Sequence, residues 1–276
     1  AIITYYLAGE PAEVTLSILD AEGRELRRFS SEKPADPYPD IPEEKKPSLP
    51  PRLEKTPGFH RFVWDLRVEG ARRVIGDKPY EGYLVGPRVV PGTYQVRLTV
   101  GDRSWTQPLE VRRDPRLSVT QEDLQRQYDL LLRIRDKVSE AHDAINRLRD
   151  ARHQLVEWQQ RLEASGASET LRERVRSLSE RLGSLLDELL EPRMDDPRQF
   201  PPRAPARLAI LQSFVDSADD RPTTGEEEVS RLLAAEIDAI LGRVRQVLEG
   251  DLPALARELV EAGANPIVPR PILARP

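Results

Sequence analysis

Residues 120–164 read TQEDLQRQYDLLLRIRDKVSEAHDAINRLRDARHQLVEWQQRLEA and contain no proline and no glycine. Pro115 precedes this stretch and Gly166 follows it, and both residue types interrupt helices. From Leu131 onward apolar residues recur every three or four positions, at Leu131, Ile134, Val138, Ala141, Ile145, Leu148, Leu155 and Leu162. The pattern predicts one α-helix about 65 Å long, from a rise of about 1.5 Å per residue. Because such a rod is longer than a compact domain, other helices must cover its apolar seam.

The residues after 164 provide that cover. Ser168, a residue type that caps helix N-termini, begins a stretch that ends at Pro192. Its seam keeps a four-three alternation through Leu171, Val175, Leu178, Leu182, Leu185 and Leu189. A shorter apolar pattern follows, made of Leu208, Leu211, Phe214 and Val215. We expect both helices to pack on the long one, since amphipathic seams are stable only when they are mated.

Two more helix signals complete the C-terminal half. Thr224 and Glu227 have the spacing of a capping box, and a seam of Val229, Leu233, Ile237, Ile240, Val244 and Val247 follows them. Asp251 is expected to cap a last helix that ends at Gly263. The sequence therefore predicts an antiparallel α-helical bundle over residues 115–276, with an extended proline-rich tail.

The first hundred residues have a period of two, which is typical of half-buried strands. Apolar residues alternate with polar ones in three stretches: Val14, Leu16 and Ile18; Phe62, Trp64 and Leu66; and Tyr94, Val96, Leu98 and Val100. The chain opens on a strand-like IITYYL, and Trp105–Val111 supplies a last strand. Turn sequences such as Pro91-Gly92 and Gly101-Asp102 divide them. We expect an antiparallel β-sandwich over residues 1–114, and thus an α+β protein of two lobes.

Two long connections interrupt the predicted sandwich. Residues 30–57 hold eight prolines and are expected to form an extended insertion. Residues 69–91 form a second long connection, and loops of that length are often functional. Tyr80, Tyr83 and Arg88 lie on it and are candidates for a ligand or partner surface.

Composition excludes several kinds of function. Cysteine is absent, so the chain has neither disulfides nor thiolate chemistry. The net charge is −5, and neither half has the basic excess that would indicate a nucleic-acid partner. No apolar run approaches the roughly 20 residues of a membrane span, and no signal peptide opens the chain. Because the sequence begins directly at Ala1 with a strand, we expect it to be a fragment of a longer protein, and its compartment stays unknown.

The residues that could carry catalysis or hold a metal have ordinary explanations. Asp65 ends a strong strand beside Trp64, where a carboxylate usually accepts backbone or arginine hydrogen bonds. His142 and His153 share a helix face, but eleven residues separate them by about 16 Å, too far for one metal ion. His153 and Glu157 have the spacing of a surface pair, and His60 sits on a strand where packing explains it. We expect no catalytic residue, no metal and no cofactor.

Aromatic residues suggest a second kind of surface. Trp64, Tyr94 and Trp105 could form a sugar-stacking platform, but their period-two placement makes Trp64 and Tyr94 core residues. Trp158 lies off the seam of the long helix, so we expect it to be exposed or to meet another chain. With Tyr80, Tyr83 and Arg88, it completes the candidate ligand or partner surface.

Several motifs of the chain resemble a known family. Asp20–Arg27, Phe62–Arg67 and Pro91–Leu98 look like parts of an immunoglobulin-like or fibronectin-like sandwich. Read together, four further motifs sharpen the resemblance: Gly86–Tyr94, Thr106–Val111, Asp114–Arg116 and Arg221–Thr224. The combination resembles the C-terminal region of bacterial sortilin-like, BNR-repeat β-propeller proteins labelled as glycosyl hydrolases. It covers nearly the whole chain, but the propeller with its Asp-box repeats is absent from this sequence, so no catalytic residue can be carried over.

The resemblance implies a function without chemistry of its own. We expect a non-catalytic C-terminal accessory region that packs against the propeller of its parent chain or mediates assembly, including homo-oligomers through its helices. The parent protein could still be a glycosyl hydrolase, and the resemblance suggests an extracytoplasmic, secreted or periplasmic, address. The alternative is a carbohydrate-binding module that uses the loop of residues 69–91. An independent hydrolase is the third hypothesis, and no recognisable motif supports it.

Overall fold

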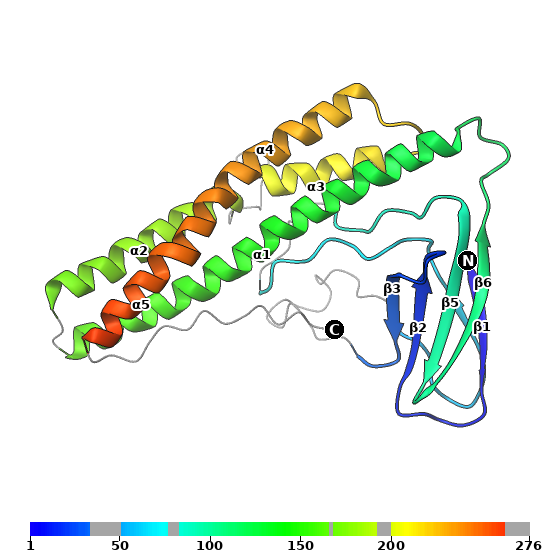
Figure 1. The fold of residues 1–276 in the computed structure, drawn as a ribbon, viewed down its shortest axis with the longest axis horizontal. Coiled ribbons are helices and arrows are strands. Elements are labelled where there is room, and N and C mark those ends of the chain that lie inside the picture. The colour runs from blue at the N-terminus through cyan, green and yellow to red at the C-terminus, as the bar shows by residue number, and fades with distance from the viewer. Residues whose placement is uncertain (34–50, 77–82, 166–167, 192–199, 263–276) are drawn as a thin grey trace.

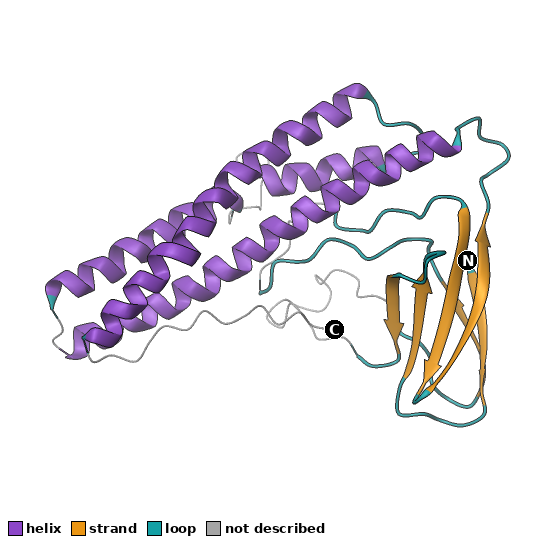
Figure 2. Cartoon of the chain, viewed as in Figure 1, coloured by secondary structure: helices purple, strands orange, loops and turns teal. Residues whose placement is uncertain are grey.

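The computed structural model describes residues 1–33, 51–76, 83–165, 168–191 and 200–262, and within them the chain is of the mixed α+β class (Figures 1 and 2). The strands are β1 (Ile2–Leu7), β2 (Val14–Leu19), β3 (Glu25–Ser30), β4 (Gly58–Val63), β5 (Gly92–Val100) and β6 (Arg103–Val111). The helices are α1 (Gln121–Ser165), α2 (Glu169–Leu189), α3 (Ala204–Val215), α4 (Thr224–Gln246), the π-helix η2 (Val247–Asp251) and α5 (Leu252–Glu261). Strands and helices thus occupy successive parts of the chain, as the change of period predicts.

The strands form two antiparallel sheets. One has the order β3-β2-β5-β6, and the other pairs β1 with β4. Strand β6 lies at an edge of the larger sheet, where Pro108, which has no amide hydrogen to donate, is tolerated. Side chains from both sheets share one hydrophobic cluster, including Leu16 of β2 and Phe62 of β4. The two sheets therefore bury their apolar faces against each other.

The sheet region confirms some expectations and corrects others. Trp64 and Tyr94 are core residues, with 1% and 7% of their surface exposed, whereas Trp105 is 51% exposed. The strand expected to run through Leu66 ends at Val63, and Leu66 itself adopts a left-handed φ of 64°, which an extended strand does not allow. Strand β3 has no clear period-two pattern in its sequence and forms through its pairing with β2.

Helix α1 has the predicted length and is the longest element of the chain (Figure 1). Thr120 and Asp123 cap its start reciprocally: each amide donates to the other residue's side chain, at 3.1 Å for the Asp123 amide and 3.3 Å for the Thr120 amide. Helices α2, α3 and α4 all contact α1 and share its hydrophobic core. No described helix combines the length and the apolar character that crossing a membrane requires.

The later helices differ in detail from the sequence expectation. Ser168 caps α2 as predicted. The capping box of α4 is made one residue earlier than expected, by Thr223 and Glu226. Asp251 caps nothing, because η2 joins α4 to α5 without a break, and its carboxylate instead binds Arg181 of α2. Phe214, expected on the buried seam of α3, is 63% exposed.

Parts of both long connections and of the C-terminal tail lie outside the described residues. Of the proline-rich insertion, residues 30–33 and 51–57 are described, and Leu53 is buried there in the core of the sheets. Tyr80 and residues 263–276, which include the tail and the expected end of the last helix, are outside the described part of the chain.

Candidate functional site

The connection between β4 and β5 joins the sheets to the helices. Its two legs, residues 66–71 and 84–89, run side by side and exchange backbone hydrogen bonds, such as Val68 to Pro87 at 3.0 Å and Val89 to Leu66 at 2.8 Å. Gly86 allows this close approach, since a Cβ at that position would lie 2.0 Å from the carbonyl oxygen of Val68. The two legs therefore form one paired segment. The "strap" below means the described residues of this connection, 66–76 and 83–89.

The outgoing leg continues along α1, where helix side chains satisfy its backbone. Ser139, His142 and Asn146 lie on one face of α1, because they are spaced by three and four residues. The Ser139 hydroxyl accepts from the Arg72 amide at 3.1 Å, and the Asn146 amide side chain both accepts from Ile75 and donates to Arg73, at 2.9 and 3.0 Å. A ring nitrogen of His142 is 2.6 Å from the Arg72 carbonyl oxygen. Buried His142 thus holds the strap against α1 through the backbone carbonyl of Arg72.

The two legs also anchor the hydrophobic cores. Ala71, Val74 and Leu84 of the strap belong to the core of the helices. In the other direction, Tyr128 and Leu132 of α1 pack against the core of the sheets. Apolar side chains from each part are therefore inserted into the other.

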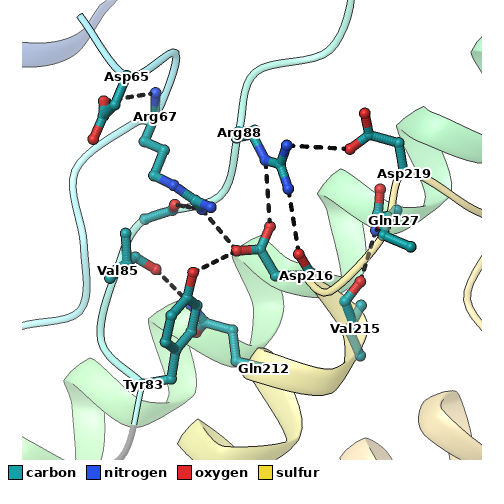
Figure 3. A network of polar contacts seen from close by, with 12 residues as sticks. Asp65, Arg67, Tyr83, Val85, Arg88, Gln127, Gln212, Val215, Asp216 and Asp219 are labelled. Atoms are coloured by element: carbon teal, nitrogen blue, oxygen red, sulfur yellow. Dashed lines mark hydrogen bonds and ion pairs between the residues drawn. The ribbon is translucent and has the colours of Figure 1, made fainter.

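A buried ionic network closes this junction at the C-terminal end of α3 (Figure 3). Asp216, which follows α3, has only 5% of its side chain exposed. Its carboxylate accepts a hydrogen bond from the Tyr83 hydroxyl at 2.7 Å and lies 2.8 Å from a guanidinium nitrogen of Arg67. Arg88 approaches more distantly, at 3.9 Å, and also lies 3.5 Å from Asp219. The "Asp216 junction" below means Arg67, Tyr83, Arg88 and Asp216.

Two glutamines extend the network with neutral hydrogen bonds. The Gln212 side-chain amide donates to the Val85 carbonyl at 2.5 Å, and the Gln127 amide donates to the carbonyl of Val215 at 2.7 Å (Figure 3). Gln212 is 1% exposed, and its side-chain oxygen has no hydrogen-bond partner among the described residues. These bonds hold the returning leg against α3 and the end of α3 against α1.

The electrostatics of the junction are those of a structural network. Burial, followed by the hydrogen bond to the Asp216 carboxylate, raises the pKa of Tyr83 to about 12. Tyr83 therefore stays protonated and donates at any physiological pH. Arg67 also donates to the Gly86 carbonyl at 2.7 Å, so its guanidinium is divided between Asp216 and the strap. The charged groups of the junction therefore compensate one another within the chain.

The sequence-predicted site residues have different fates. Tyr83 and Arg88 are brought together at the carboxylate of Asp216 (Figure 3). Trp158 is neither exposed nor near them: it is partly buried against the core of the helices, with the Arg161 guanidinium 5.3 Å from its ring centre. As a ligand or partner surface the predicted group stays a prediction, with these side chains already engaged within the chain.

The residues weighed for chemistry have the structural partners expected of them. Asp65 accepts from Arg27 at 2.8 Å and from the Arg67 amide at 3.1 Å. His153 pairs with Glu157 at 3.2 Å on the surface, and His60 stacks beside Tyr5 with ring centres 5.1 Å apart. Within the described ranges, no three His, Asp or Glu side chains cluster as ligands of a metal ion would.

The sequence analysis did not identify three residues of this network: Asp216, Arg67 and Gln212. A weak signal exists, since Gln212 and Asp216 are four residues apart and share the face of α3 that carries buried Leu208. Polar residues on a buried helix face require partners, but the sequence does not identify them.

A groove of about 700 Å³ lies elsewhere, between α2 and α5. Its charged lining is largely neutralised across the groove, because Arg181 binds Asp251 and Arg174 lies 3.0 Å from Glu258. Glu169 and Glu173, the other acidic residues that line the groove, pair with Arg172 and Arg176 of α2 itself. Each charged residue of the lining therefore has a partner within the chain, although exposed pairs of this kind contribute little to stability.

No model of a known protein family, no curated protein and no solved structure matches this chain.

Proposed function

We propose that the chain is a non-catalytic interaction region whose two parts act as one rigid frame. The observation that carries the proposal is the Asp216 junction, because the polar residues most able to form a ligand site are used to join sheets to helices. The strap and the exchanged apolar side chains strengthen the same joint. A frame of this kind holds surfaces on its two parts at a fixed angle to each other.

The finer fold belongs to the same proposal. Two sheets that share a core are consistent with an immunoglobulin-like or fibronectin-like sandwich over residues 1–114. Helices that share a core with α1 are consistent with an antiparallel bundle over residues 115–276. The family resemblance adds the partner: a sortilin-like, BNR-repeat β-propeller of the parent chain, in an extracytoplasmic setting.

Light scattering coupled to size-exclusion chromatography tests this function. We expect the chain, mixed with a purified sortilin-like β-propeller domain, to elute as a complex whose mass is the sum of the two. An isolated chain that stays strictly monomeric and ignores the propeller contradicts the proposal. Turnover of aryl glycosides by the isolated chain, lost in Asp65→Asn, would contradict its non-catalytic part.

Carbohydrate binding through residues 69–91 receives less support from the geometry. Tyr83 is half of the aromatic pair on which that hypothesis rests, and its hydroxyl is bonded to Asp216. A sugar that stacked on its ring would compete with the contact between the strap and α3. A glycan array with Tyr83→Ala and Tyr80→Ala controls tests this alternative, and absence of any bound glycan removes it.

A further inference from the structure

The outer face of the β1–β4 sheet is unusually apolar for a surface. Three cross-strand rows make it up: Ile2 with Val63, Thr4 with Arg61, and Tyr6 with Phe59. Ile2, Tyr6 and Val63 are 58–60% exposed, and Phe59 is 79% exposed. We call these six residues the β1–β4 face.

The opposite face of the same two strands explains why the exposed one is available. Successive side chains of a strand point to opposite sides, and Tyr5, Leu7 and Phe62 occupy the inner positions in the core of the sheets. The residues of the β1–β4 face therefore contribute little to that core. The fold of the sheets does not require the residues of the β1–β4 face to be apolar.

The composition of the face matches that of a protein interface. Aromatic residues and arginine are enriched at such interfaces, and lysine, glutamate and aspartate are depleted. The rings of Tyr6 and Phe59 lie 4.9 Å apart, which preorganises them as one anchor. At about 150–250 Å² for each aromatic side chain, Tyr6, 58% exposed, and Phe59, 79% exposed, together offer roughly 200–340 Å². With Ile2 and Val63 added, the face reaches the roughly 300–600 Å² of the functional patches found on monomers.

Arg61 gives the face a charge requirement. It is exposed in the middle row, opposite Thr4, and makes no ion pair with any residue that the structure describes. A partner that covers the apolar rows also removes water from this guanidinium, which must then be compensated. The covering surface therefore needs an acidic group opposite Arg61.

We propose that the β1–β4 face docks a folded protein domain through an apolar surface that carries a carboxylate opposite Arg61. The inference rests on the proposed function and names the surface by which the partner propeller is bound. A second copy of the chain fits less well, because two-fold stacking of the face on itself brings the central Arg61 of each copy together. A sugar also fits less well, because the Tyr6 and Phe59 rings are tilted by 50° and the third row is aliphatic.

Binding of a purified sortilin-like β-propeller domain, measured by isothermal titration calorimetry, tests the inference. We expect Phe59→Ser to weaken binding by about tenfold or more, as loss of a central aromatic anchor does. Phe214→Ser, which removes another exposed phenylalanine from α3, is the matched control and should leave binding unchanged. Circular dichroism verifies that both variants are folded.

Salt dependence tests the predicted carboxylate. The affinity of the unsubstituted chain should fall as ionic strength rises, and Arg61→Gln should be weaker at low salt and nearly independent of it. Arg61→Lys should keep most of the dependence. If Phe59→Ser and Phe214→Ser bind alike, or Arg61→Gln keeps the full salt dependence, the inference is wrong while the proposed function stands.

Two further outcomes separate the inference from its premise. If the unsubstituted chain does not bind the propeller at all, the proposed function fails and the inference fails with it. The same titration with alginate, an acidic polysaccharide, covers the remaining occupant. Binding of alginate that Phe59→Ser abolishes assigns the face to carbohydrate and overturns the inference.

Discussion

Replacing Asp216 by alanine should uncouple the sheets from the helices. The substitution leaves the guanidinium of Arg67, 14% exposed, without the carboxylate that lies 2.8 Å away. It also removes the acceptor of the Tyr83 hydroxyl. Because the alanine side chain is smaller and apolar, no new clash arises, and the loss reports the network itself.

The structure sets a graded expectation for three variants. Removing one partner of a buried ion pair costs about 3–5 kcal/mol, and we expect Asp216→Ala near the lower limit because Arg67 keeps its bond to Gly86. Tyr83→Phe loses a hydrogen bond to a charged acceptor, which is worth about 1.5 kcal/mol. Arg88→Gln should cost less than about 1 kcal/mol, since its side chain is 42% exposed, lies 3.9 Å from the Asp216 carboxylate and makes a long hydrogen bond of 3.4 Å to the Asp216 backbone carbonyl.

Urea unfolding followed by two signals measures both stability and coupling. Far-UV circular dichroism reports the helices, and fluorescence of Trp64, buried beside the strap, reports the sheets when Trp105 and Trp158 are replaced by phenylalanine. The two transitions should coincide in this background and separate in Asp216→Ala, where the helices and sheets unfold independently. Asp219→Asn, at the exposed edge of the junction, is the matched control and should behave as the background does.

The order of these three losses of stability can be contradicted by measurement. If Asp216→Ala lowers stability by less than about 1 kcal/mol, the buried pair does not hold the parts together. If Arg88→Gln costs as much as Asp216→Ala, distance and exposure do not determine the contributions. Coincident transitions in Asp216→Ala would show that the strap and the apolar contacts alone couple the two parts.

Three further predictions concern single positions. The pKa of Tyr83 is about 12 in the folded chain and about 10 when unfolded, so its contribution to stability is complete below pH 10 and is lost as pH rises toward 12. Over that interval the urea midpoint of Tyr83→Phe should therefore fall less than the midpoint of the unsubstituted chain. Gly86→Ala should cost about 2 kcal/mol or more in urea unfolding because its Cβ would meet a backbone oxygen, whereas Gly9→Ala, with open space around it, should be neutral. Thr223→Ala should lose about 1 kcal/mol in thermal unfolding by removing the cap of α4, and an unchanged midpoint would reject that cap.

Local patterns were sufficient for much of the fold. The absence of proline and glycine from 120–164 and the three-and-four spacing of apolar residues predicted α1 to within one residue at each end. The cap at Ser168 and the burial of Trp64 and Tyr94 were also predicted correctly. These features depend on residues a few positions apart, which a sequence displays directly.

Other predictions failed because a local pattern was ambiguous or because neighbours in space decided the outcome. The cap of α4 moved to Thr223 because either threonine has an acidic residue three positions later, so the sequence pattern is ambiguous. Trp158 is off the apolar seam of α1, yet it is partly buried because its ring reaches the edge of the helical core. An exposed apolar face on β1 and β4 was also invisible, since alternation does not show which side of a strand a second sheet covers.

By itself the sequence determined the long helices and most of the strands, because periodicity, proline and glycine act over a few residues, whereas β3 depends on its pairing with β2. Only the tertiary structure decided what the polar residues of the long connection do. Tyr83 and Asp216 are 133 positions apart, and nothing local to either one indicates the other. Their contact depends on how the strap crosses α1 and α3, and burial at that crossing makes the Asp216 carboxylate require the Tyr83 hydroxyl and the Arg67 guanidinium as partners.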